Sequence, residues 1–164
     1  WVVTTPHAPL LFSASSVAEF CMLKSGRENI KGDGDPIDIC VLTEKEITHG
    51  NILVKARPIG GFRMIDRDES DDKIIAVMFN DTVYGHFNDI SELPSLVVER
   101  LKHYFLTYKD LPGQESNVVI TPVFGMEAAH EVRRRSMEDD HHKFDTLDRA
   151  LSNVWVRPYL KLKT

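Results

Sequence analysis

The chain has 164 residues, of which 42% are hydrophobic and 27% charged, so it has the length of one ordinary domain and enough apolar residues for a buried core. Its formal net charge of -5 argues against a nucleic-acid partner, which requires a basic surface. The two cysteines lie in no zinc-like pattern and no apolar run reaches the roughly 18–20 residues that span a bilayer, which favours a soluble, reducing, cytoplasmic setting.

The first elements in chain order are a helix and a buried strand. Apolar residues recur at helical spacing within residues 15–24, and Gly26 follows them, so we expect a short helix there. After the Gly/Asp/Pro turn at residues 32–36, residues 37–42 are mostly β-branched or apolar and predict a buried strand. An acidic turn therefore leads directly into this strand.

Further strands follow without an intervening helix. Residues 51–59 have a strand-like pattern, Gly60 and Gly61 are expected to break it, and residues 62–65 and 73–79 are the next strands. Short strands separated by Gly and Pro predict an antiparallel meander that closes into a small barrel, in preference to βαβ units.

Helices dominate the second half of the chain. Residues 94–108 have a clear helical period, residues 118–124 predict an edge strand containing Pro122, and residues 126–137 predict a second helix. The basic run 133–135 and the acidic run 138–140 are interpreted as a solvated helix face. The expected organisation is one domain over residues 1–164, with a motif-bearing core at 32–124 and a C-terminal helix and tail at 126–164.

Two clusters of aspartates occupy turns next to predicted strands. Either cluster alone fits the ordinary enrichment of aspartate in turns. Together they favour a divalent-cation site, because closely packed carboxylates repel unless a cation neutralises them and hard oxygen ligands suit Mg²⁺ or Mn²⁺. The clusters comprise Asp33, Asp35 and Asp38, and Asp66, Asp68, Asp71 and Asp72.

A calcium-binding loop is the competing interpretation of the first cluster. Asp33, Asp35 and Glu44 fall at its first, third and twelfth positions. Ile37 occupies the fifth ligand position, however, and Asp38 stands where that loop requires glycine. The mismatches exclude this type of loop.

Cationic and hydroxyl donors accompany the second cluster. Lys73 follows it directly, and Tyr108 and Lys109 lie at the end of the long predicted helix, a combination that suits a phosphate ligand. Taken singly, Lys73 fits an ordinary strand-edge lysine and Tyr108 a core aromatic with a solvated hydroxyl. For each residue taken singly, this ordinary interpretation is favoured over a phosphate contact.

Three segments resemble one known family. Residues 32–38, Gly-Asp-Gly-Asp-Pro-Ile-Asp, resemble the D-x-D-P-x-D signature of family I soluble inorganic pyrophosphatases. Residues 61–66 and 71–76 resemble the second metal-binding segment of that family, and residues 103–111 resemble its third motif. The motifs occur in the family's order and close to its spacing over residues 32–111.

The resemblance implies Mg²⁺-dependent hydrolysis of inorganic pyrophosphate to two phosphates by a homo-oligomeric enzyme, either dimer or hexamer. It implies an α+β, mainly β fold, a small twisted five-stranded OB-like barrel with helices packed outside. The implied roles are metal ligation by Asp33, Asp38, Asp66 and Asp71, proton acceptance from the attacking water by Asp35, and binding of phosphate oxygens by Lys73, Tyr108 and Lys109.

The chain departs from the family pattern in two places. Family members supply a lysine, a glutamate, an arginine and a tyrosine ahead of the first signature, the last within a Tyr-Pro-x-Asn-Tyr-Gly segment that this sequence lacks. The N-terminal strands are therefore expected to be missing or altered. In addition, Arg67 follows Asp66 where the family usually has glutamate. The alternative function is a catalytically impaired, metal-dependent protein that binds pyrophosphate or phosphate on the same scaffold; a less favoured one is a structural subunit with solvated acidic turns.

Overall fold

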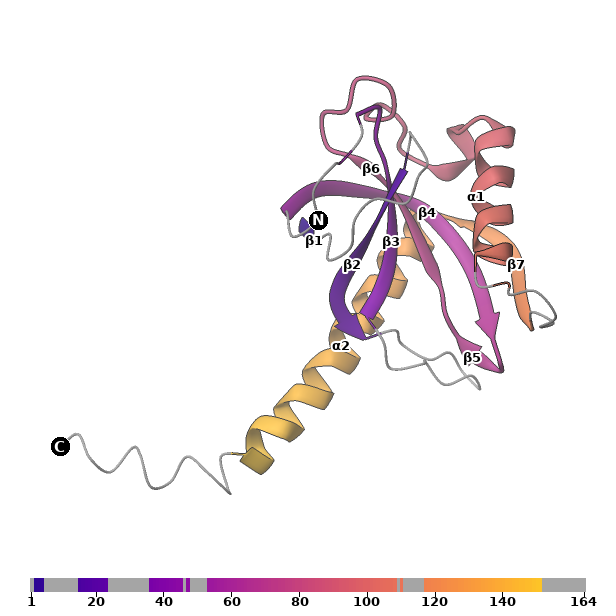
Figure 1. Ribbon diagram of the computed structural model, residues 1–164. Coiled ribbons are helices and arrows are strands. Elements are labelled where there is room, and N and C mark those ends of the chain that lie inside the picture. Colours follow the sequence, from indigo (N-terminus) through magenta and orange to yellow (C-terminus); the bar gives the residue numbers. More distant parts are fainter. Residues whose placement is uncertain are drawn as a thin grey trace.

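The computed structural model describes residues 2–4, 15–23, 36–45, 47, 53–108, 110 and 117–151. Strands predominate in the first two thirds of the chain and helices in the last third (Figure 1). The elements are β1 (Val2–Thr4), β2 (Ser15–Leu23), β3 (Pro36–Leu42), β4 (Leu53–Asp66), β5 (Glu69–Ser70), β6 (Lys73–Met78), the short 3-10 helix η1 (Ile90–Glu92), α1 (Ser95–Thr107), β7 (Val118–Gly125) and α2 (Met126–Leu151).

Five of the strands form a closed ring. β1 pairs with β2, β2 with β3, β3 with β6, β6 with β4, and β4 with β1. β5 and β7 both pair with β4, and the two long helices flank the strands (Figure 1). The expectation of a small, mainly β barrel with helices outside it is confirmed.

The prediction of an antiparallel meander is wrong at one pairing. β3 and β6 run parallel, with Asp38 opposite Lys73 and Leu42 opposite Val77. β4 lies between them in the sequence but pairs on the far side of β6, so β6 inserts between β3 and β4. Residues 74–77 are fully buried, as expected for a strand covered on both faces.

The helix predicted at residues 15–24 is a strand, β2. It pairs antiparallel with β3 from Ser15 opposite Leu42 to Leu23 opposite Pro36, with one irregularity between Phe20 and Leu23. Helical spacing over so short a stretch is a weak signal, and hydrogen bonding to a neighbouring strand overrides it. Two strands thus precede β3, so the N-terminal part of the chain contributes to the ring.

The break predicted at Gly60 and Gly61 is also absent, because β4 runs through both residues. The glycines are required for close packing. A Cβ atom on Gly61 would lie 2.3 Å from the carbonyl oxygen of Lys73 and 2.5 Å from the Phe124 ring. A Cβ on Gly60 would lie 2.4 Å from the carbonyl oxygen of Phe124. The absence of a side chain at Gly60 and Gly61 allows Phe124 and the backbone of Lys73 to pack closely against β4.

Replacement of Gly61 by alanine is therefore expected to lower the free energy of unfolding by about 1–3 kcal/mol or more, because the added methyl group meets backbone that must move. Urea denaturation measures the change. Arg63→Ala, an exposed position on the same strand, is the control and should have little effect. Equal stability of the Gly61 variant and the parent would contradict this packing.

Alternate residues of β3 and β6 face two separate apolar clusters. Ile37, Ile39 and Val41 pack in the cluster that includes Ala129 and Val132 of α2. Cys40 and Leu42 of β3, with Ile75 and Val77 of β6, join Leu101 and Phe105 of α1 in the other cluster. Strand alternation therefore assigns one face to α2 and the opposite face to α1.

Asp89 joins the starts of two helical elements. Its carboxylate accepts hydrogen bonds from the Ser91 N–H at 3.0 Å, the Ser91 hydroxyl at 2.7 Å and the Met126 N–H at 2.8 Å. The bonds from Met126 and Ser91 hold the pKa of Asp89 below its ordinary value. Asp89 thereby ties η1 to the first residue of α2.

The predicted helices differ in accuracy. The helix expected at 94–108 is α1, and β7 pairs with β4 and contains Pro122, as an edge strand permits. The helix expected to end near residue 137 continues to Leu151, and its C-terminal half extends beyond the sheet (Figure 1).

Neither helix in the described part of the chain combines the length and hydrophobicity needed to cross a bilayer.

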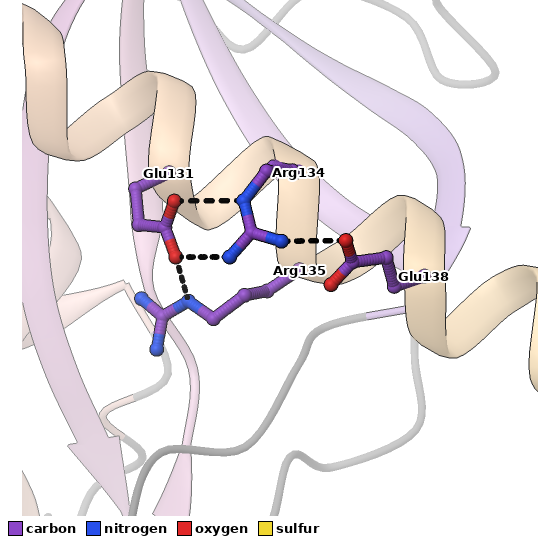
Figure 2. A network of polar contacts seen from close by, with 4 residues as sticks. All are labelled: Glu131, Arg134, Arg135 and Glu138. Atoms are coloured by element: carbon purple, nitrogen blue, oxygen red, sulfur yellow. Dashed lines mark hydrogen bonds and ion pairs between the residues drawn. The ribbon is translucent and has the colours of Figure 1, made fainter.

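Ion pairs line the exposed face of α2 (Figure 2). Arg134 donates to Glu131 at 2.9 and 2.7 Å and to Glu138 at 2.5 Å, and Arg135 lies 3.5 Å from Glu131. The bond from Arg134 lowers the pKa of Glu131. Contacts between residues three and four apart stabilise this part of the helix. Arg134 itself is exposed, as predicted for this charge run.

Candidate functional site

The parallel pairing of β3 and β6 brings Asp38, the described aspartate of the first acidic cluster, beside the second acidic cluster. Asp38 in β3 stands opposite Lys73, the first residue of β6. Residues two apart in a strand lie on the same face of the sheet. Asp38 therefore shares a face with Cys40, and Lys73 with Ile75, and this is the face that α1 covers. Asp71 precedes Lys73 by two residues. The site therefore forms where β6 begins, beneath α1.

Lys73 connects the two acidic segments through a buried ammonium group. Its Nζ contacts Asp38 Oδ2 and lies 2.6 Å from Asp71 Oδ1. Lys73 and Asp71 are only 1% and 2% exposed, whereas Asp38 is 22% exposed. The interpretation of Lys73 as an ordinary strand-edge lysine is therefore wrong. Buried charges require such pairing, because removal from water costs several kcal/mol per ion.

Aromatic side chains of α1 form the wall above this cluster. The Lys73 ammonium lies 6.0 Å from the centre of the Phe105 ring. Tyr104 stacks on Tyr108 at a centroid distance of 5.4 Å and an angle of 26°. Burial, followed by the nearby Tyr108, Cys40 and Asp38, raises the pKa of Tyr104 above its ordinary value. Tyr104 thus remains a neutral hydroxyl group beside the acidic cluster.

Tyr108 lies at the C-cap of α1 and is 41% exposed. Its ring also meets Phe105 edge-on, with a centroid distance of 6.2 Å. The core-aromatic interpretation of Tyr108 therefore does not hold, since much of the side chain faces solvent. Tyr104 is a residue that the sequence reasoning missed, although its position four residues before Tyr108 places both on one helix face.

Asp66 closes the hairpin between β4 and β5. It pairs with Glu69, and the two residues between them, Arg67 and Asp68, have φ angles of 49° and 69°. Two successive positive φ angles are typical of a type I′ hairpin turn. The turn exposes Arg67 and leaves Asp66 half-buried at the strand end.

The structure thus places five of the eight predicted site residues. It brings Asp38, Asp71 and Lys73 into contact, with Tyr108 on the adjacent helix and Asp66 at the nearby hairpin. Asp33, Asp35 and Lys109 lie outside the described residues. Within the residues that are described, no three acidic, histidine or cysteine side chains are close enough to hold a metal ion.

Comparison with known proteins identifies relatives over most of the chain. The family model described as inorganic pyrophosphatase matches residues 8–141. An inorganic pyrophosphatase of Chlamydia trachomatis is 50% identical over 136 residues, which cover 80% of this chain and 65% of that protein. An inorganic pyrophosphatase of Chlamydia caviae is 50% identical over 126 residues, 74% of this chain and 58% of that protein. The chain therefore spans less than two thirds of the length of these relatives.

Solved structures agree with the family match. The inorganic pyrophosphatase of Helicobacter pylori has a TM-score of 0.66 at 27% identity, covering 79% of this chain and 72% of that one. A structure from Anaplasma phagocytophilum, described as an inorganic phosphatase, has a TM-score of 0.71 at 20% identity and covers 85% and 92% of the two chains. The second likeness concerns the fold alone. With the family model matching most of its length, the chain belongs to the inorganic pyrophosphatase family.

Proposed function

We propose that this chain carries the metal- and phosphate-binding core of an enzyme that hydrolyses inorganic pyrophosphate to two phosphates with Mg²⁺, or Mn²⁺ as a substitute. The observation that carries the proposal is the buried contact of Lys73 with both Asp38 and Asp71. Family membership supports the same reaction class.

The chemistry of the cluster fits a divalent cation. Asp38 of β3 and Asp71, two residues before the start of β6, would supply hard oxygen ligands, and the Lys73 ammonium contacts both carboxylates. Asp66, half-buried at the end of β4, is proposed as a further ligand, and Asp33 as the fourth. These carboxylates would hold Mg²⁺ in this part of the site.

The remaining residues would act on the water and the phosphates. Bound Mg²⁺ lowers the pKa of a coordinated water and polarises phosphate oxygens. Asp35 would accept a proton as the water oxygen bonds to one phosphorus and the bridging P–O bond breaks. Lys73, Tyr108 and Lys109 would donate hydrogen bonds to phosphate oxygens, which stabilises the charge on the departing phosphate.

A second candidate function is metal-dependent binding of pyrophosphate or phosphate without efficient turnover. Arg67 favours it, since this exposed cation follows Asp66 at the hairpin where the family usually places glutamate. A positive charge beside a metal ligand weakens cation binding by repulsion and can contact a phosphate. Only the enzyme releases phosphate, which distinguishes the two functions.

The test is phosphate release from pyrophosphate by the purified chain, with and without Mg²⁺, together with the Asp71→Asn variant. Release that requires Mg²⁺ and disappears in the variant would establish the hydrolase. Calorimetric titration with pyrophosphate in the presence of Mg²⁺ provides the second reading. Binding without release would favour the binding protein. If the chain neither binds pyrophosphate nor releases phosphate from it, both functions are refuted for this chain.

We also propose that the chain forms a homo-oligomer, a dimer or a hexamer. Leu96 of α1 and Val119 and Val123 of β7 are exposed apolar residues and could contribute to an interface. Light scattering of the purified chain gives its mass directly, and a monomer at micromolar concentration would contradict the proposal.

A further inference from the structure

Asp72 occupies an interruption in an otherwise continuous strand pairing. The pairing of β4 with β5 and its pairing with β6 follow one register, in which Met64 stands opposite Asp71. β5 ends at Ser70 and β6 begins at Lys73, so the interruption consists of Asp71 and Asp72. It lies directly before the lysine that contacts both acidic segments.

A side chain replaces a backbone acceptor at this interruption. Facing residues of an antiparallel pair can exchange two hydrogen bonds, one in each direction. The Asp71 N–H donates to the Met64 carbonyl at 2.9 Å, as a regular pair requires. The Met64 N–H donates instead to Oδ1 of Asp72, at 3.3 Å. The Asp72 carboxylate thus supports β4 where the ladder is interrupted.

Burial shows that this aspartate is not an ordinary solvated turn residue. Asp72 is 6% exposed, compared with exposed Asp68 in the nearby hairpin. A carboxylate removed from water requires hydrogen-bond donors, and a backbone N–H of β4 supplies one. Asp71 and Asp72 are therefore both buried, Asp71 directed to Lys73 and Asp72 to the backbone of β4.

We propose that Asp72 is a positioning residue for the metal site. Through the Met64 N–H it holds the start of β6 against β4, so that the Asp71 carboxylate is presented beside Asp38 and at a constant separation from Asp66 at the end of β4. The inference rests on the proposed function, since it concerns the same site. Asp72 acts as a hydrogen-bond acceptor in this role and does not contact the metal.

Calorimetric titration with Mg²⁺ tests the proposal, because binding is measured whether or not the chain turns over pyrophosphate. Asp72→Ala removes the acceptor and is expected to weaken Mg²⁺ binding by about 10- to 100-fold. Asp72→Asn retains an acceptor oxygen for the Met64 N–H and should bind within a few-fold of the parent. The control is Asp68→Asn, at the exposed turn, which should bind like the parent.

Hydrogen exchange at the Met64 amide provides a reading that needs no metal. Exchange should accelerate in Asp72→Ala and stay close to the parent rate in Asp72→Asn. If the parent binds Mg²⁺ and Asp72→Ala binds it equally well, the inference about Asp72 is wrong and the proposed function stands. Equal losses in the Ala and Asn variants would also overturn it, since charge would then matter in place of the acceptor. A parent that binds no Mg²⁺ would refute the proposed function and, with it, this role.

Discussion

Replacement of Lys73 by methionine is expected to lower the free energy of unfolding of the metal-free chain by about 3–5 kcal/mol. Methionine retains much of the volume of the lysine but removes the ammonium that contacts Asp38 and Asp71. Both carboxylates then lie close together without the cation between them, and Asp71 is only 2% exposed. Urea denaturation in the presence of EDTA measures the loss.

Magnesium should reverse part of this loss. Mg²⁺ bound by the folded chain stabilises it by mass action, and the variant has more uncompensated negative charge to neutralise. The midpoint of unfolding should therefore rise more with Mg²⁺ in Lys73→Met than in the parent. A variant as stable as the parent in EDTA, or one that Mg²⁺ stabilises no further, would contradict the role of the Lys73 ammonium as an internal counter-ion.

The control for Lys73 is an ion pair on the surface. Arg134 contacts Glu131 and Glu138 on α2 and is 57% exposed, so its charges remain hydrated when the pair is broken. Arg134→Met should change the unfolding midpoint far less than Lys73→Met does. Similar effects of the two substitutions would show that burial does not decide the contribution of Lys73.

Replacement of Asp35 by asparagine is expected to lower the turnover number for pyrophosphate by about 10²- to 10⁴-fold, the usual contribution of a positioned general base. Asparagine has nearly the same shape but cannot accept the proton of the attacking water. The measurement is steady-state phosphate release at saturating Mg²⁺ and pyrophosphate.

Two further measurements separate loss of chemistry from loss of structure. The urea midpoint and the Mg²⁺ affinity of Asp35→Asn should remain close to those of the parent, because Asp35 is assigned no metal ligation. Asp68→Asn, in the exposed hairpin turn, is the matched control and should retain parental turnover. An unchanged rate in Asp35→Asn would remove Asp35 from the mechanism.

Local sequence patterns located the elements that are buried on both faces or strongly periodic. The strands predicted at 37–42 and 73–79 correspond to β3 and β6, and the helix predicted at 94–108 corresponds to α1. Continuous β-branched runs and a helical period are local properties, so they can be read without knowledge of the partners. The pattern of short strands and the motif resemblance both predicted the barrel, whereas the site roles that the resemblance implies stay predictions.

Two features that depend on distant partners were predicted wrongly. Residues 15–23 form a strand because β3 provides hydrogen-bond partners along their length. Gly60 and Gly61 continue β4 because Phe124 and the backbone of Lys73 pack directly on them. Local propensity differs by less than about 1 kcal/mol between most residues, so such contacts override it.

The sequence by itself determined the chemistry available to this protein: two aspartate-rich turns, a lysine directly after the second, and a tyrosine–lysine pair at a helix end. Tertiary structure alone decided that Asp38 and Asp71 share one buried ammonium group and that Asp72 supports the backbone of β4. The reason is that β6 inserts between β3 and β4 and runs parallel to β3. Strand register sets which side chains meet, and burial sets how strongly their charges interact.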